Sequence, residues 1–287
     1  MVLLCSSNIV VKSFNKQFLL LGAGLTALVN SCVTYSSVED FRLELPKINN
    51  GETIITYSGY PDIKNSDNTT DYLAVTKIAY TVSYDSRNKI PRWVAYELTS
   101  EELVGTATRK GKSFRPDERA GVPQADNNDY RNSGWTRGHL APAGDFKWDD
   151  SAMNDTFYYT NCCPQSEALN TGSWQKLENR VRNWAEMFGE VYIITGPIIG
   201  SAENGSIGVN QVTVPDAFFK AVLTREGESY QAVAFILENS SASQSYTNCC
   251  LSVNELEDII GIDLFPSLDD SIEEAVESTF NKRFWGI

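Results

Sequence analysis

Residues 79–99 read AYTVSYDSRNKIPRWVAYELT and predict how the core of this protein is built. Apolar and polar side chains alternate over residues 79–85 and again over 93–99, with the period of two that is typical of half-buried β-strands. The segment SRNKIP (86–91) between them is mostly polar and ends in proline, which indicates a turn. The stretch therefore predicts an antiparallel hairpin.

Apolar stretches further along the chain predict more strands and several helices. Strands are expected at residues 191–195 (VYIIT), 218–224 (FFKAVLT) and 231–237 (QAVAFIL). A helix capped by Ser173 is expected to run to about residue 188, with apolar residues at helical spacing. Two further helices are expected at 254–261 and 271–280. Together these elements predict an α+β fold with an antiparallel β core and helices, in one domain over residues 76–287.

The composition limits what the chain can do. With 42 % hydrophobic and 21 % charged residues it has the composition of a folded globular protein. Its formal net charge is −13, so any binding of a polyanion must rely on a local basic patch. His139 is the sole histidine of the sequence, which excludes paired-histidine zinc sites and mechanisms that need two imidazoles.

The first 32 residues have the pattern of an export signal. Lys12 and Lys16 precede an apolar run at 18–29 (FLLLGAGLTALV), which is too short to cross a bilayer as a helix. The run ends in LVNSC (28–32), which is similar to a lipoprotein signal in which Cys32 is acylated. Cleavage by an ordinary signal peptidase is the alternative. We therefore expect a signal over 1–32, a tether and lead-in over 33–75, and a protein exported and anchored to a membrane by lipid at Cys32, or otherwise periplasmic or secreted.

Four cysteines remain in the expected mature chain, as the adjacent pairs Cys162–Cys163 and Cys249–Cys250. Four thiols allow three connectivities. Because a bridge between neighbouring residues strains the backbone, a link from one pair to the other is expected in an oxidising compartment. Four reduced, buried thiols are the alternative.

Basic residues concentrate in one part of the sequence. Residues 105–147 contain eight Lys and Arg against five Asp and Glu, a local excess of three positive charges in an acidic protein. Such a segment can neutralise phosphates. It can also be an ordinary solvated loop with scattered charges.

A set of short motifs begins within this basic segment and continues beyond it. They are TRGHLAP (136–142), YTN (159–161), PQ (164–165), LN (169–170), Trp174, LE (177–178) and Arg182. In this order and spacing the chain resembles the DNA/RNA non-specific endonucleases, the ββα-metal or His-Me finger nucleases that include endonuclease G. The resemblance covers about 180 residues, from the hairpin to VNELE (253–257).

The resemblance implies a role for each motif residue. His139 would be the general base, which suits a lone imidazole near neutral pH. Asn170 would be the single protein ligand of Mg²⁺, with Mn²⁺ as an alternative; such sparse ligation suits magnesium, which keeps its waters. Glu178 would contact metal-bound water. The remaining catalytic candidates are Arg137, Asn161, Arg182 and Arg109.

The resemblance gives a specific role to three of these four candidates. Arg182 lies four residues after Glu178, hence on the same helix face, and would be near the phosphate or leaving group. Asn161 would support the His139 strand, and Arg109 would be the upstream arginine that some members contribute. The sequence departs from the family at Thr136, where an aspartate usually precedes Arg137. The resemblance further implies that the strands at residues 161 and 249 lie side by side, which would pair Cys163 with Cys249.

Three functions follow as hypotheses. The first is a metal-dependent endonuclease that hydrolyses phosphodiester bonds in DNA and RNA without regard to the sugar. The second is a surface lipoprotein with the nuclease fold that binds nucleic acid with weak or no catalysis. The third is an adhesion or glycan-binding module, which only the 13 tyrosines favour.

Overall fold

A computed structural model describes residues 62–63, 72–76, 79–201, 204–227 and 229–287. The expected signal, the lipid site Cys32 and most of the expected tether lie outside the described residues. No helix among the described residues is long and apolar enough to cross a membrane.

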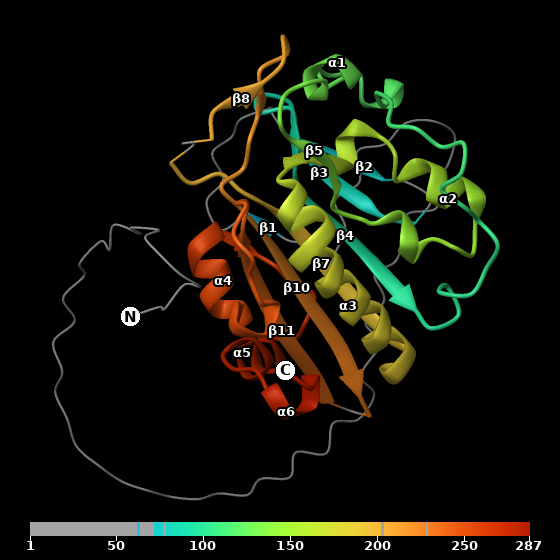
Figure 1. Ribbon diagram of the computed structural model, residues 1–287. Helices are drawn as coiled ribbons and strands as arrows, with labels where there is room; N and C mark the ends of the chain where they lie inside the picture. The colour runs from blue at the N-terminus through green and yellow to red at the C-terminus, as the bar shows by residue number, and fades with distance from the viewer. Residues whose placement is uncertain (1–61, 64–71, 77–78, 202–203, 228) are drawn as a thin grey trace, which may run out of the picture.

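The predicted hairpin forms two neighbouring strands of a seven-stranded antiparallel sheet (Figure 1). Strand β3 (Thr81–Asp85) pairs with β4 (Ile90–Thr99), and β4 pairs with β7 (Glu190–Ile198). The strand order is β12-β11-β10-β7-β4-β3-β2. The other members are β2 (Tyr72–Thr76), β10 (Ala217–Glu226), β11 (Ser229–Glu238) and β12 (Cys250–Leu251). The predicted fold class, α+β with an antiparallel core, is therefore confirmed.

The sheet begins before residue 76, where the sequence analysis places the start of the domain. Strand β2 is hydrogen-bonded to β3, and the short strand β1 (Asp62–Ile63) pairs with β13 (Ile262–Asp263) near the other end of the chain. The alternation that marks β3 and β4 is missing from β2 (YLAVT), and β1 has only two residues, too few to show it.

The sheet separates two hydrophobic cores because its strands alternate. In β4, Val94 and Tyr96 face one core, whereas Trp93 and Ala95 face the other. Helix α3 (Trp174–Phe188) packs on the first face through its apolar stripe of Trp174, Leu177, Val181, Trp184 and Ala185. Helix α4 (Val253–Ile260) packs on the second face. Helices α3 and α4 thus cover opposite faces of the sheet.

The remaining elements are short. They are α1 (Asn127–Tyr130), α2 (Asp150–Asp155), α5 (Asp270–Glu277), α6 (Lys282–Trp285), β5 (Thr136–His139), β6 (Cys162–Gln165), β8 (Ser206–Ile207), β9 (Val212–Thr213), the 3₁₀ turns η1 (Glu118–Ala120), η2 (Ala143–Asp145), η3 (Tyr159–Asn161) and η5 (Tyr246–Asn248), and the π-helical turn η4 (Leu169–Ser173). Most of the elements that lie between η1 and η4 in the sequence surround one end of α3. The motif residues lie at this end.

Ser173 does not cap α3 as expected. The helix follows directly on η4, so Ser173 is itself in the helical region and its side chain makes no capping bond. Its hydroxyl instead donates to the carbonyl of Gln244, at 2.6 Å. A π-helical turn before a helix has no sequence signal as clear as a cap.

The predicted Cys163–Cys249 disulfide is wrong. No disulfide joins these residues in the described part of the chain, where Cys163 is a buried thiol in β6. Strand β6 pairs with β5 in a small sheet of its own, whereas Cys249 precedes β12 at the edge of the large sheet. Burial raises the pKa of the Cys163 thiol well above its ordinary value, as expected for a thiol that packs as a small apolar group.

Candidate active site

A two-stranded antiparallel sheet of β5 and β6, together with the following helix α3, holds the motif residues together; Figure 1 shows β5 beside one end of α3. Strand β5 contains TRGH (136–139) and pairs antiparallel with β6, so that His139 lies opposite Cys162 and Gly138 opposite Cys163. A β-carbon at Gly138 would lie 2.3 Å from Oε1 of Gln165. Only glycine therefore lets the strands approach this closely.

His139 ends β5 in an aromatic pocket. Its ring is 8 % exposed and lies 4.7 Å from the Phe114 ring and 5.0 Å from the Phe157 ring, between centroids. Burial, together with the positive charge of Arg109, lowers the pKa of His139 to about 3. The imidazole is therefore neutral at physiological pH, and its Nε2 has no hydrogen-bond partner among the described residues.

Asn161 holds the backbone that follows His139. Its Oδ1 accepts from the amide of Ala141, and its Nδ2 donates to the carbonyls of Ala141 and Thr156, all at 2.9 Å. The Leu140 amide donates to the Asn161 carbonyl and continues the β5–β6 ladder. Because the buried side-chain amide is used up in these bonds, Asn161 is a positioning residue here.

Thr136 and Asn170 are linked. The Asn170 Nδ2 donates to Oγ1 of Thr136 at 2.9 Å, and Thr136 Oγ1 donates to the Gln165 carbonyl at 2.7 Å. The bond from Nδ2 orients the amide and leaves its carbonyl Oδ1 available as a hard oxygen ligand. Thr136, the residue that departs from the family pattern, thus orients the predicted metal ligand by a hydroxyl.

Glu178 and Arg182 lie on one face of α3 but have different surroundings. Arg182 Nη1 donates to Asp145 Oδ1 at 2.5 Å, and Tyr96 Oη donates to the other oxygen of Asp145 at 2.9 Å. Glu178 is half-buried beside this network. Burial raises the pKa of Glu178 above its ordinary value, and the Lys220 ammonium opposes that rise. Arg182 is thus bound to Asp145.

Lys220 is a member of this group that the sequence analysis missed. It lies on β10, is 1 % exposed, and its Nζ has no hydrogen-bond partner among the described residues. The ammonium lies 4.8 Å from the centre of the Trp174 ring. Burial lowers the pKa of Lys220, and the carboxylates of Glu178 and Asp145 oppose that shift. The sequence signal was available, because a lysine stands in the middle of the apolar strand FFKAVLT (218–224).

The two remaining candidates lie on either side of His139. The Arg137 Nε donates to Tyr159 Oη at 3.2 Å, and its guanidinium lies 5.0 Å from the Tyr130 ring centre. Arg109 is exposed and lies 5.7 Å from the Phe157 ring, which also contacts His139. Its charge acts on both His139 and Glu178. The structure therefore brings all seven predicted site residues to one region between β5, η4 and α3.

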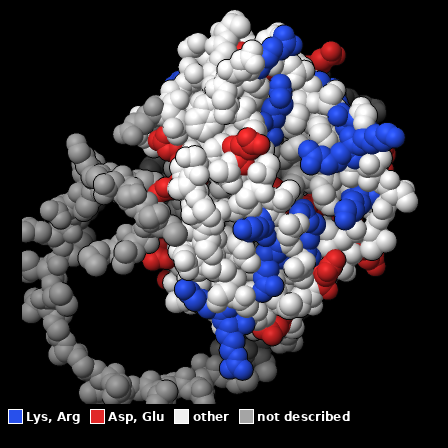
Figure 2. Space-filling view, viewed as in Figure 1, with Lys and Arg blue, Asp and Glu red and all other residues white. Residues whose placement is uncertain are grey.

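The charges around this region suit a polyanion. Figure 2 shows Lys and Arg side chains gathered on the face that includes α3, with fewer carboxylates among them. No cluster of three or more His, Cys, Asp or Glu in the described part of the chain could hold a metal ion. A divalent cation here would depend on the amide oxygen of Asn170, the carboxylate of Glu178 and water, a donor set that fits Mg²⁺.

The fold and this arrangement define a class of protein. The family model of the DNA/RNA non-specific endonucleases matches residues 61–271, and the chain belongs to this family.

Particular relatives are mitochondrial nucleases. The chain is 37 % identical to mitochondrial nuclease EXOG of Danio rerio over 206 residues, which cover 66 % of this chain and 60 % of that protein. It is 35 % identical to mitochondrial endonuclease G of Homo sapiens over 178 residues, 58 % of this chain and 60 % of the relative. The chain therefore spans less than two thirds of these relatives' length.

Solved structures agree with this assignment. The fold is similar to a chain in the crystal structure of the EndoG/EndoGI complex, with a TM-score of 0.64 and 26 % identity, covering 69 % of this chain and 88 % of that one. EndoG is a ββα-metal nuclease, and the paired strands β5 and β6 with α3 are the ββα unit of the present chain.

Proposed function

We propose that this protein is a metal-dependent, sugar-non-specific endonuclease that hydrolyses phosphodiester bonds in DNA and RNA. The observation that carries the proposal is the neutral imidazole of His139, whose Nε2 is unbonded, in one ββα unit with the Asn170 amide and the Glu178 carboxylate. Family membership and the names of the relatives support it.

Each residue has a defined task in the proposed reaction. His139 accepts the proton of the attacking water at a nitrogen that is neutral over the physiological range. Asn170 and, through water, Glu178 hold the metal. When bound, Mg²⁺ or Mn²⁺ supplies positive charge for the phosphoryl oxygens and the leaving 3′-oxygen. Arg182 and Arg109 add positive charge near the phosphate, while Asn161 and Arg137 hold the strand that carries His139.

Cleavage of plasmid and of single-stranded RNA, with Mg²⁺ or with EDTA, tests the proposal. Both substrates should be cut with Mg²⁺ and neither with EDTA, since nothing in the site distinguishes the two sugars. His139→Ala should lose at least about a hundredfold in rate, because no second imidazole can replace it. Met187→Ala, which changes an exposed side chain at the end of α3, is the control. Uncut substrate at high enzyme and Mg²⁺ contradicts the proposal and favours a nucleic-acid-binding protein without catalysis.

Asn170 gives a second, independent test. Asn170→Ala should raise the Mg²⁺ concentration needed for half-maximal cleavage and leave the metal-free melting temperature nearly unchanged. An unchanged metal titration would show that Asn170 is only a loop residue.

We also propose that the protein is exported and anchored by lipid at Cys32. The N-terminal pattern of lysines, a short apolar run and LVNSC supports this proposal. Cys32→Ser should release the protein from the membrane fraction, and an unchanged distribution would contradict the anchor.

A further inference from the structure

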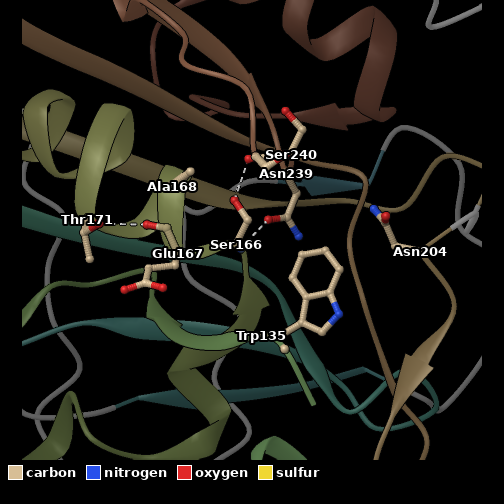
Figure 3. A pocket seen from close by; sticks show the side chains of 10 residues that line it. Trp135, Ser166, Glu167, Ala168, Thr171, Asn204, Asn239 and Ser240 are labelled. Carbon is tan, nitrogen blue, oxygen red and sulfur yellow. Dashed lines mark hydrogen bonds between the residues drawn. The ribbon is translucent and has the colours of Figure 1, made fainter. Parts of the chain in front are cut away.

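A hollow of about 750 Å³ lies directly beside the proposed metal ligand (Figure 3). Trp135 on its wall immediately precedes Thr136, which orients Asn170, and Thr171 on the opposite wall immediately follows Asn170. The hollow is therefore lined by the direct chain neighbours of Asn170 and of its partner Thr136. The volume is in the range of small-molecule sites.

The walls of the hollow do not suit a phosphate. Among the described residues that line it, Glu167 is the only one with a charge, and that charge is negative. The other lining residues are neutral: Gly134, Trp135, Ser166, Ala168, Thr171, Asn204, Asn239, Ser240 and Ser241. In an otherwise basic neighbourhood, such a wall favours an uncharged part of a nucleic acid over its backbone.

Trp135 offers an aromatic face. Its indole ring is partly exposed, and in Figure 3 it lies against the hollow below Ser166 and Asn239. Bases stack on such rings without regard to sequence. The ring is also held on one side, because Trp135 packs against the main core.

The floor of the hollow is already assembled. Asn239 Oδ1 accepts from the Ser166 amide at 2.8 Å, and Asn239 Nδ2 donates to the carbonyls of Pro164 and Pro215. Ser166 Oγ donates to the Ser240 carbonyl at 2.6 Å. These bonds already fix the side chains of Asn239 and Ser166, so ligand binding does not have to order them.

We propose that this hollow binds one unpaired nucleobase of the substrate, stacked on Trp135, while the adjoining phosphate lies at Asn170. The inference rests on the proposed nuclease function and narrows it. A base in the hollow must leave its partner, so single-stranded DNA and RNA are the better substrates and duplexes are cut where a base can be unpaired.

Binding without metal tests the hollow separately from catalysis. In EDTA, fluorescein-labelled single-stranded 12-mers with bases are compared by anisotropy with 12-mers of the same backbone in which every residue is abasic. The wild type should prefer the strand with bases by at least about tenfold. Trp135→Ala should lose this preference, and Trp135→Phe should keep part of it. Trp148→Ala, which removes an exposed tryptophan outside the hollow, should retain it.

The other outcomes overturn the proposal. If Trp135→Ala and the wild type prefer the strand with bases equally, the hollow does not bind a base. This conclusion holds whether or not the protein cleaves. If only Trp148→Ala loses the preference for bases, the base binds outside the hollow, which also contradicts the proposal. If Trp135→Ala does not fold, Trp135→Leu keeps apolar volume against the core and removes the aromatic face, and the same outcomes apply.

A cleavage measurement completes the test. The base-free diester bis(4-nitrophenyl) phosphate should be hydrolysed equally by the wild type and Trp135→Ala, whereas the KM for single-stranded DNA should rise about tenfold in the variant. An equal loss on both substrates would mean that Trp135 only supports the site, which contradicts the proposal. A wild type that cleaves nothing refutes the nuclease function, and the binding comparison still decides the hollow.

Discussion

His139 illustrates how the environment of one residue sets its chemistry. The rings of Phe114 and Phe157 exclude water from the imidazole, and the charge of Arg109 adds to the effect, so the pKa of His139 falls to about 3. The ring is then neutral over the physiological pH range, which is the form that can accept a proton. The same burial makes the protonated imidazole unfavourable in the folded protein. The free energy of unfolding should therefore depend on pH.

We therefore expect His139 to make the fold less stable in acid. The unfolded chain takes up a proton at His139 below about pH 6.5, whereas the folded chain does so only near pH 3. Stability is thus lost as the pH falls through 6.5, by roughly 2 kcal/mol between pH 7 and pH 5. Urea unfolding at both values, in EDTA, should show this loss in the wild type and not in His139→Gln. Parallel pH profiles for the two proteins would contradict it.

Thr136 should matter for metal binding through Asn170. Thr136→Val removes the hydroxyl that accepts from Asn170 Nδ2, so the ligand amide is no longer oriented. We expect the Mg²⁺ concentration for half-maximal cleavage to rise about tenfold, the low end for loss of a group that orients a ligand. Thr136→Ser, which keeps the hydroxyl, should behave as the wild type. Identical Mg²⁺ titrations for the valine and serine variants would exclude this role.

At the scale of elements, α3 and β10 meet through charged side chains inside the core. Lys220 on β10 lies over Trp174, one turn before Glu178 on α3. A buried ammonium is costly unless carboxylates are near. Asp145 of η2, which binds Arg182 and Tyr96, adds a third element to the same group. The position of Glu178 therefore depends on the packing of the helix against the sheet.

Lys220→Met should change the pH dependence of cleavage. Without the ammonium, burial and Asp145 raise the pKa of Glu178 further, so its carboxylate is protonated over a wider range. We expect a lower kcat at neutral pH that recovers at higher pH, with KM little changed. Lys220→Arg keeps the charge and should retain more of the wild-type profile. A uniform loss at every pH would show that Lys220 only packs.

The whole molecule combines an acidic composition with a basic working face. The net charge is −13, yet the face that includes α3 carries most of its visible charge as Lys and Arg (Figure 2). Attraction to a polyanion is therefore local and sensitive to salt.

Arg109→Ala should lower the salt dependence of nucleic-acid binding. Loss of one phosphate contact reduces the slope of log K against log salt by about one. Metal-free binding of single-stranded DNA over a range of NaCl concentrations measures this slope. Arg225→Ala, whose Nε donates to the Gly227 carbonyl in the β10–β11 turn, should leave it unchanged. Equal slopes for the two variants would remove Arg109 from the binding face.

Local patterns in the sequence were sufficient for the central elements of the fold. Alternation over residues 79–99 predicts the β3–β4 hairpin, and the apolar stripe after residue 173 predicts α3, because both depend on contacts that one face of an element makes. The site residues, by contrast, were expected only because their motifs resemble the endonuclease family, and no local pattern predicts that they gather.

Only the tertiary structure decided how distant segments meet. It placed Lys220 beside Glu178, tied Arg182 to Asp145 and gave Asn170 its partner Thr136. It also put Cys163 in the β5–β6 sheet and Cys249 just before β12 of the large sheet. No local pattern encodes these contacts, because each joins side chains from elements whose pairing is set by the packing of the whole sheet. The same packing buries His139, and burial determines the protonation state on which the proposed chemistry depends.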